Sequence, residues 1–168
     1  ALGIGHRVES FAYCVSVGVS IAATTLVGQS LGAKNTVRIR EIAWSISAYA
    51  CGLMFFISII ILLFKEAIAG IFTSDPAVIA AASGYLRAIA YTEIFLAVEI
   101  VMEGVFSGMG NTMPPTVIGL PLNILRLPAA YYFSGIFGID GIWWTIGVST
   151  VLKGLILVIW FKFTTISL

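Results

Sequence analysis

The sequence predicts an all-α fold, a polytopic bundle of five membrane-spanning helices, and three observations predict it. Of its 168 residues, 60% are hydrophobic and 10% are charged, and mean hydropathy is +1.06, whereas a soluble domain carries roughly 25% charged residues. The polar residues are too few to cover a core in water, which indicates lipid as the solvent. Apolar runs recur at the length that a helix needs to cross ~30 Å of hydrocarbon.

The first two helices are delimited by polar punctuation. The first is expected over residues 2–31, because Gly32 and the polar residues after it supply a C-terminal stop and a turn. The second is expected over residues 37–64 and ends before Lys65 and its acidic neighbour. Both runs are long enough to span a bilayer.

The third helix is expected over residues 76–107, after a short polar loop. Ser74 or Asp75 can cap its N-terminus, and Pro76 fits its first turn. This run is longer than a bilayer requires, so its first turns are expected in the headgroup region.

The last two helices form a pair joined by a glycine-containing turn. The fourth is expected over residues 114–134, and its interior prolines, Pro121 and Pro128, predict a kinked course. The fifth is expected over residues 142–164. We therefore expect one transmembrane domain over residues 1–168.

The positive charges predict an orientation in the membrane. Lys34, Arg38 and Arg40 follow the first helix, and Lys162 lies at the end of the fifth. These positions lie on the same side of an odd-numbered serpentine, and lysine and arginine mark the cytoplasmic side. We expect a multi-pass protein of the cell membrane with a cytoplasmic C-terminus.

Several function classes are excluded by what the sequence lacks. The net charge is +1 without a basic run, which disfavours nucleic-acid binding. Cys14, Cys51 and the single His6 have no metal-ligand spacing. No second histidine exists to activate a serine, and no Gly-Lys-Ser phosphate loop is present. We expect neither an enzyme nor a bound cofactor.

Ionisable residues inside the predicted spans are the candidate functional residues. Such a residue costs several kcal/mol (~3 or more) at membrane depth unless it is paired or hydrated, so it indicates a functional site. The first helix contributes one, the third contributes three, and the fourth and fifth each contribute a cation. They are Glu9, Glu93, Glu99, Glu103, Arg126 and Lys153.

Counting from the turns predicts which of these charges meet. If the third and fourth helices pack as a hairpin, Arg126 lies level with Ala97 and within reach of Glu93 and Glu99. Folding the fifth helix back brings Lys153 to about the same layer. The two cations can therefore lock helices together as supporting ion pairs, or they can belong to a functional site.

The four glutamates outnumber the two cations. Glu99 and Glu103 are four residues apart and share a helix face. Glu9 has no cation near it in sequence except Arg7. Some carboxyl groups must therefore be protonated, hydrated or bound to a cation. A carboxyl group held in this way can take up and release a coupling ion.

Four segments resemble the multidrug and toxic compound extrusion (MATE) family of transporters. Residues 6–12 (HRVESFA) and 17–35 (VGVSIAATTLVGQSLGAKN) resemble the family's eighth transmembrane helix and the cytoplasmic turn after it. Residues 72–76 (FTSDP) resemble the external loop between the ninth and tenth helices. Residues 103–115 (EGVFSGMGNTMPP) resemble the end of the tenth helix and the loop into the eleventh.

The resemblance implies a fragment of a longer transporter. The five helices would be the eighth to twelfth of the family, the larger part of a C-terminal lobe. The partners it implies are the lobe's own first helix, the six-helix N-terminal lobe and membrane lipid. Family members exchange cationic or amphiphilic drugs for protons or sodium ions by rocking two lobes about a central cavity.

The resemblance also bears on individual residues. Glu9 matches the acidic position of the family's eighth helix, which faces the cavity. Thr92 and Leu96 fall near the places of tenth-helix Tyr and Asp sodium ligands of some members, so this sequence departs from that sodium site. The expected coupling residues are Glu9 with one or more of Glu93, Glu99 and Glu103.

Two other functions remain open at this stage. Flippases of the same superfamily move lipid-linked sugars, although their cavities tend to be cationic and the third helix here is rich in acids. A truncated half that only packs against another membrane subunit would not transport at all. Five helices alone cannot enclose a substrate between two lobes.

Overall fold

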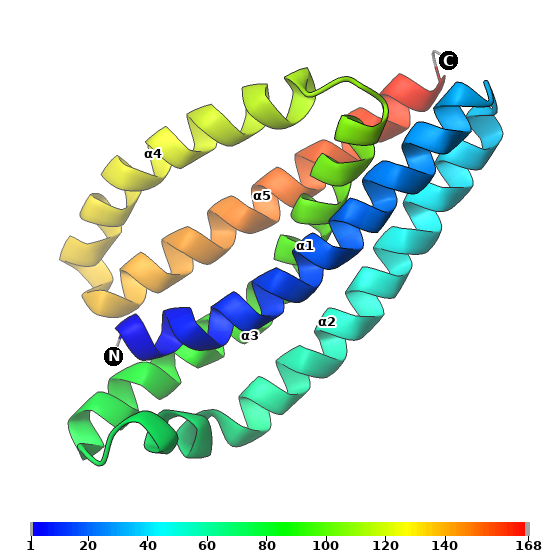
Figure 1. The fold of residues 1–168 in the computed structure, drawn as a ribbon. Coiled ribbons are helices and arrows are strands. Elements are labelled where there is room, and N and C mark those ends of the chain that lie inside the picture. The colour runs from blue at the N-terminus through cyan, green and yellow to red at the C-terminus, as the bar shows by residue number, and fades with distance from the viewer. Residues whose placement is uncertain (1, 167–168) are drawn as a thin grey trace.

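The computed structural model describes residues 2–166, all of them in five helices and the short turns between them (Figure 1). Ala1 and residues 167–168, which belong to the predicted domain, lie outside the described residues. The helices are α1 (Leu2–Gly32), α2 (Thr36–Phe72), α3 (Pro76–Gly108), α4 (Met113–Phe137) and α5 (Ile139–Ile166).

The helix ends follow the predicted punctuation, with one clear difference. Asn35 caps α2 by accepting a hydrogen bond from the backbone N–H of Arg38 at 3.0 Å. The predicted cap of α3 is Asp75, which accepts from the N–H of Ala77 at 2.9 Å. The sequence predicted that the second helix ends at residue 64. In the structure residues 65–72 continue α2, and the helix ends where Thr73 adopts an extended backbone conformation.

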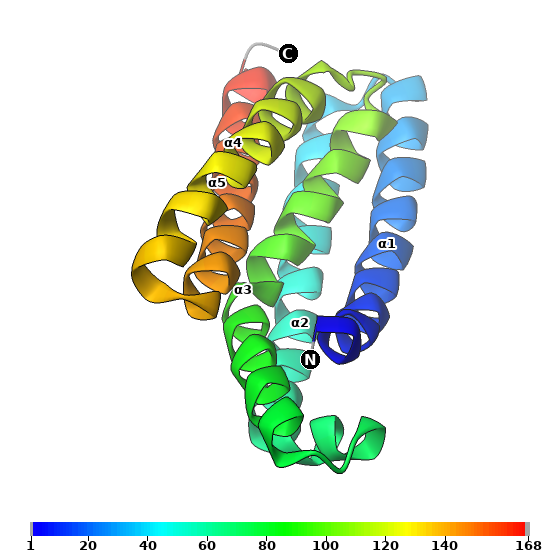
Figure 2. The ribbon, with the colours of Figure 1, turned by 90° about the vertical axis from the view of Figure 1, so that its left-hand side faces the viewer.

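Helix α3 lies at the centre of the bundle. Helices α1, α2 and α5 pack against it, and α4 packs mainly against α5 (Figures 1 and 2). The turns at 33–35 and 109–112 lie at the same end of the bundle as the C-terminal end of α5 (Figure 1). The turn at 73–75 lies at the opposite end, as an up-and-down chain requires.

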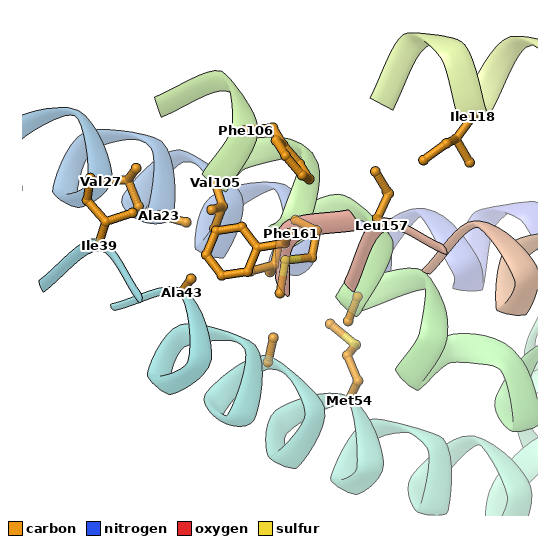
Figure 3. Packing of buried hydrophobic residues seen from close by; sticks show 14 of the residues in the cluster. Ala23, Val27, Ile39, Ala43, Met54, Val105, Phe106, Ile118, Leu157 and Phe161 are labelled. Carbon is orange, nitrogen blue, oxygen red and sulfur yellow. The ribbon is translucent and has the colours of Figure 1, made fainter. Parts of the chain in front are cut away.

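A hydrophobic cluster to which all five helices contribute holds this arrangement together (Figure 3). Phe106 of α3 and Phe161 of α5 are fully buried and meet edge to face with ring centroids 6.0 Å apart. Met54 of α2, Leu157 of α5 and Ile118 of α4 lie in the same cluster. Fully burying one such side chain contributes roughly 1.5–3 kcal/mol.

The expected packing of the third helix against the fourth is wrong, because α5 occupies that side of α3. Gly147 and Gly154 allow α5 to approach closely: a Cβ on Gly147 would meet the Thr92 side chain at 2.6 Å, and one on Gly154 would meet the Phe95 carbonyl at 3.0 Å. Helix α4 contains both of its prolines, remains one helix and follows a curved course outside α5 (Figure 1). Helices α3 and α4 therefore make few contacts with each other.

Membrane-spanning character is strongest in three of the helices. Within the described part of the chain, residues 5–32, 36–72 and 141–164 are long and apolar enough to cross a membrane on length and composition alone. Helix α3 carries Glu93, Glu99 and Glu103, and helix α4 carries Arg126 and the two interior prolines. The residues that are costly to place in lipid are thus concentrated in the central helix α3 and in α4, which packs against α5.

Candidate functional site

The three glutamates of α3 point to two different sides of that helix. Glu99 and Glu103 are one turn apart, whereas Glu93 lies about 120° around the helix axis from Glu99. Glu93 shares its side with Gly104, which packs against Ser20 of α1. Glu99 shares its side with Phe95, which packs against α5. The charged residues therefore form two groups, one toward α1 and one toward α5.

The group toward α1 is centred on the Glu9 carboxylate. Tyr85 of α3 donates its hydroxyl hydrogen to Glu9 Oε2 at 2.8 Å. His6 Nδ1 lies 3.1 Å from the same oxygen and forms an ion pair when the imidazole is protonated. Arg7, the cation next to Glu9 in sequence, instead lies over the Phe72 ring, 6.0 Å from its centroid. Glu9 keeps 24% of its side chain exposed.

Tyr85 is fixed in place by its neighbours, so that its hydroxyl is directed at Glu9. Its ring is 3% exposed and meets Trp143 of α5 edge to face, with centroids 4.6 Å apart. Gly5 of α1 lies against the same ring, and a Cβ there would collide with it. The ring of His6 is tilted against it at 6.1 Å. Three helices therefore meet at this tyrosine.

Glu93 is the buried member of the group toward α1. It is 1% exposed, and its Oε1 has no hydrogen-bond partner among the described residues. It interacts electrostatically with Glu9. A carboxylate buried without a donor is unstable as an anion and must be protonated or bind a cation or water. Among the described residues, the imidazole of His6 is thus the one basic group seen to pair with either of these two acids.

A small cavity of about 30 Å³ opens beside Glu9, between α1, α3 and α5. Space of this order can hold an ordered water molecule where polar partners are present. The polar groups around it are the carboxylate of Glu9 and the hydroxyls of Tyr85, Thr92 and Thr150. The apolar lining residues include Ile89, Leu96, Trp143 and Ile146. The cavity can therefore hold a water molecule but not a drug-sized molecule.

The group toward α5 is built on an ion pair. Lys153 Nζ of α5 lies 3.1 Å from Glu99 Oε1, and both side chains are more than nine-tenths buried. The other oxygen, Glu99 Oε2, is buried and has no hydrogen-bond partner among the described residues. Counting from the turns had placed these two residues in one layer, and the structure confirms that they meet.

Glu103 completes the group toward α5. It is half-buried, one turn along α3 from Glu99, and interacts electrostatically with both Glu99 and Lys153. Within residues 2–166 it makes no hydrogen bond. One ammonium group is therefore shared by two carboxyl groups.

The expected ion pair of Arg126 with Glu93 or Glu99 is not formed. Arg126 donates through Nε to Ser149 Oγ at 2.7 Å and through Nη2 to Thr150 Oγ1 at 3.4 Å. The reason is the packing of α4 on α5 rather than on α3, so that the guanidinium finds its partners among the hydroxyl groups of α5. Arg126 still influences Glu99 electrostatically, but it supports the α4–α5 contact rather than the acids.

A large groove of about 730 Å³ lies between α4 and α5. Its walls are mostly apolar, and Arg126 is the only charged residue among those that line it. A cation is therefore disfavoured there by charge. None of the four candidate glutamates lines this groove, so the acidic residues and the large cavity are separate features.

Close contact between α1 and α3 keeps the acids of both helices in register. Ser20 Oγ donates to the carbonyl of Ile100 at 2.8 Å, and Thr24 Oγ1 donates to the carbonyl of Gly104 at 2.9 Å. A Cβ on Gly104 would collide with Ser20. The pairing of small residues with hydroxyl side chains is typical of membrane helix interfaces.

Sequence reasoning missed the neutral partners of the site. Tyr85 and Trp143 gave no signal, because aromatic residues are frequent in any membrane helix. The contact of His6 with Glu9 had a signal, since residues three apart lie on one helix face. Among the described residues no three His, Cys, Asp or Glu side chains gather to hold a metal ion. The two groups are thus built from carboxyl groups, hydroxyls, one imidazole and the ammonium group of Lys153.

Comparison with known proteins gives a consistent result. A family model described as MatE matches residues 1–132. The chain is 36% identical over 148 residues to the Probable multidrug resistance protein NorM of Thermotoga maritima, covering 83% of this chain and 31% of that protein. It is 32% identical over 133 residues to human Multidrug and toxin extrusion protein 2, covering 74% of this chain and 22% of that protein.

A plant relative and a solved structure extend the match to nearly the whole chain. Protein DETOXIFICATION 36 of Arabidopsis thaliana is 31% identical over 166 residues, which is 95% of this chain and 32% of that protein. The inward-facing structure of a multidrug resistance MATE family transporter of the MOP superfamily superposes with a TM-score of 0.81 at 18% identity, covering 97% of this chain and 38% of that one. The chain therefore spans about a third of the length of such proteins.

Proposed function

Because this chain belongs to the MatE family, we propose that it is part of a secondary active antiporter that exports cationic or amphiphilic compounds in exchange for protons or sodium ions. Similarity to proteins named for multidrug resistance and toxin extrusion supports export of such compounds. The choice of exchanged ion and the class of compound are what the family resemblance implies, and the acidic residues of the site support a cationic cargo.

The observation that carries the proposal is the group toward α1. Glu9 and Glu93 lie near each other, and Glu93 is buried with an oxygen that no donor satisfies. Two carboxyl groups with so little compensation attract a cation, whether a proton, a metal ion or a positively charged substrate. The same pair can hold either cargo or coupling ion, but holding both brings two positive charges together.

That competition supplies the physical basis of exchange. A ligand shifts a conformational equilibrium only by its difference in affinity for the two states. If substrate and coupling ion bind the same carboxylates, release of one follows binding of the other as the access side changes. Tyr85 keeps one oxygen of Glu9 occupied by a hydroxyl donor at 2.8 Å, which orients the carboxylate and leaves its second oxygen for the exchanged ligand.

The rest of the machinery lies outside this chain. We propose that the N-terminal lobe and the first helix of the C-terminal lobe complete the transporter, that lipid surrounds the bundle, and that the C-terminus is cytoplasmic. The exposed aromatic and aliphatic side chains along α2 and α4, such as Tyr49, Phe56, Leu127 and Tyr131, support burial of these helices by lipid or by other parts of the same protein.

The test is transport by the complete protein carrying Glu9→Gln. The expected result is a loss of ion-driven efflux from proteoliposomes, since the amide cannot exchange a proton for a cation. Glu66→Gln, which changes an exposed acid at the far end of α2, is the matched control and should transport normally. Undiminished coupled efflux by Glu9→Gln removes Glu9 from the mechanism.

The coupling ion is identified by the driving gradient. Proteoliposomes with a proton gradient but no sodium gradient, and the reverse, distinguish the two ions. Thr92 and Leu96 stand near the places of the sodium ligands of some family members, so a proton gradient is expected to suffice. Efflux driven only by sodium would contradict that expectation and leave the antiporter itself in place.

A further inference from the structure

The group toward α5 contains more carboxyl groups than it has cations to balance them. Two carboxyl groups, Glu99 and Glu103, share the single ammonium group of Lys153. The function proposed above uses Glu9 and Glu93 and leaves these three residues without a role beyond helix packing. Inside a membrane protein an unpaired carboxylate is costly. The protonation state of Glu103 therefore decides whether this group of residues is stable.

The hydrogen bonds of Glu99 show that one donor is missing from this group. Lys153 Nζ satisfies Glu99 Oε1 at 3.1 Å. Glu99 Oε2 is buried and has no donor among the described residues. Glu103 lies one turn along the same face, a spacing at which side chains reach each other, and it makes no hydrogen bond within residues 2–166. A proton on Glu103 would supply the donor that Glu99 Oε2 lacks.

No other titratable group that the structure describes takes that place. On α4, Arg126 influences Glu99, but its hydrogen bonds go to Ser149 and Thr150, and it exerts no comparable influence on Glu103. On α5, Lys153 is the one charged group that acts on both acids. In the described parts of α1 and α2 no titratable group acts on either acid.

We propose that Glu99, Lys153 and Glu103 form a second proton-binding site, in which one exchangeable proton sits on Glu103 and is donated to Glu99 Oε2. On release the proton leaves the Glu103 carboxyl group, which becomes a carboxylate, and passes to water. Half-burial gives Glu103 a route outward that Glu99 lacks. As a coupling site it rests on the function proposed above; as a proton site it does not.

A proton fits this place better than a metal ion. The ammonium group of Lys153 is 3.1 Å from Glu99 Oε1, and a second full cation held by the same carboxylate would be repelled by it. A proton on Glu103 neutralises one carboxylate and removes its repulsion toward Glu99. Among the described residues the site offers too few acidic ligands for a metal.

The test measures bound protons in the purified complete transporter, without transport. Infrared spectroscopy detects the C=O band of a protonated carboxyl group, and acid–base titration counts exchangeable protons. Glu103→Gln should remove one such band and one exchangeable proton per transporter. Glu41→Gln, which alters an exposed acid of α2, is the control and should remove no protonated-carboxyl band.

Two further variants keep the test decisive. In Glu99→Gln a neutral amide replaces the charged acceptor, so the Glu103 band should shift, because its hydrogen bond to a charged oxygen is gone. Glu103→Asp keeps a titratable group but shortens it, so the proton should remain countable while its band shifts. If Glu103→Gln does not fold, these two variants still report the site.

Two results would overturn the proposal. One is a band and proton count unchanged in Glu103→Gln, which would place the proton elsewhere. The other is a shift of the wild-type carboxylate bands with added sodium chloride, but not potassium chloride, that Glu103→Gln abolishes, which would make the site a sodium site. Neither result depends on efflux, so a failure here is distinguishable from a failure of the antiporter proposal.

Discussion

The two faces of α3 are joined to their neighbours by different forces. Toward α1 the contact uses small residues and neutral hydrogen bonds, such as Thr24 Oγ1 to the carbonyl of Gly104 at 2.9 Å. Toward α5 it also uses a buried ion pair, Lys153 with Glu99 at 3.1 Å. Both faces carry acids, but among the described residues it is the face toward α5 that carries a buried cation, Lys153.

The difference teaches how a membrane helix can carry both fixed and exchangeable charge. An acid paired with a lysine is held in place, because removal of either partner strands the other in a medium that does not solvate it. An acid that contacts only a tyrosine and a histidine still has an oxygen that can bind an exchanged cation. The face toward α1 is thus suited to coupling, and the face toward α5 to anchoring with a spare acid beside it.

The largest expected effect is that of Lys153→Met in the complete transporter. It leaves Glu99 buried without its cation, and loss of one partner of such a pair costs about 3–5 kcal/mol. Thermal unfolding of the purified protein in detergent measures it. The double change Lys153→Met with Glu99→Gln should recover most of the loss; if the double variant is as unstable as the single one, charge does not hold this face.

Next in size is Gly104→Ala on the face toward α1. The added Cβ collides with Ser20 of α1, and overpacking of this kind costs typically about 1–3 kcal/mol. Gly119→Ala, where nothing lies near the added atom, is the control and should not destabilise. Equal unfolding temperatures for the two variants would show that close approach is not what joins α1 to α3.

A smaller effect is expected for Tyr85→Phe. The ring keeps its contact with Trp143, while the hydrogen bond to Glu9 is lost, at about 1 kcal/mol. Its functional effect should exceed its effect on stability, because Glu9 loses its orienting donor. Efflux and unfolding are measured together, with the exposed, stacked Tyr91→Phe as the control. Normal efflux would reduce Tyr85 to a packing residue.

The smallest expected effect is that of Thr24→Val. It preserves shape and removes one hydroxyl that donates to the carbonyl of Gly104, for a loss of about 0.5–1 kcal/mol. Thr25→Val, which removes a hydroxyl bonded only within α1, should cost less. If Thr25→Val proves the more damaging of the two in the same unfolding experiment, interhelix hydrogen bonds are not a significant part of this face.

Part of the site could be predicted from local counting. The shared face of Glu99 and Glu103 follows from their spacing, and the meeting of Lys153 with Glu99 followed from counting along the chain to equal depth. The same counting also predicted that Arg126 meets the acids, and this was wrong, because Arg126 donates to Ser149 instead. Counting gives depth in the membrane and direction around one helix axis, but it does not identify the helix that lies in that direction.

The sequence by itself determined the number of helices, their lipid surroundings and the family, because each depends on composition, period and short motifs read along the chain. Only the tertiary structure decided that α5 rather than α4 lies against α3, that Tyr85 reaches Glu9, and that Glu99 Oε2 is left without a donor. Those outcomes depend on which small residues let two helices approach, and that fit is made between residues far apart in the chain.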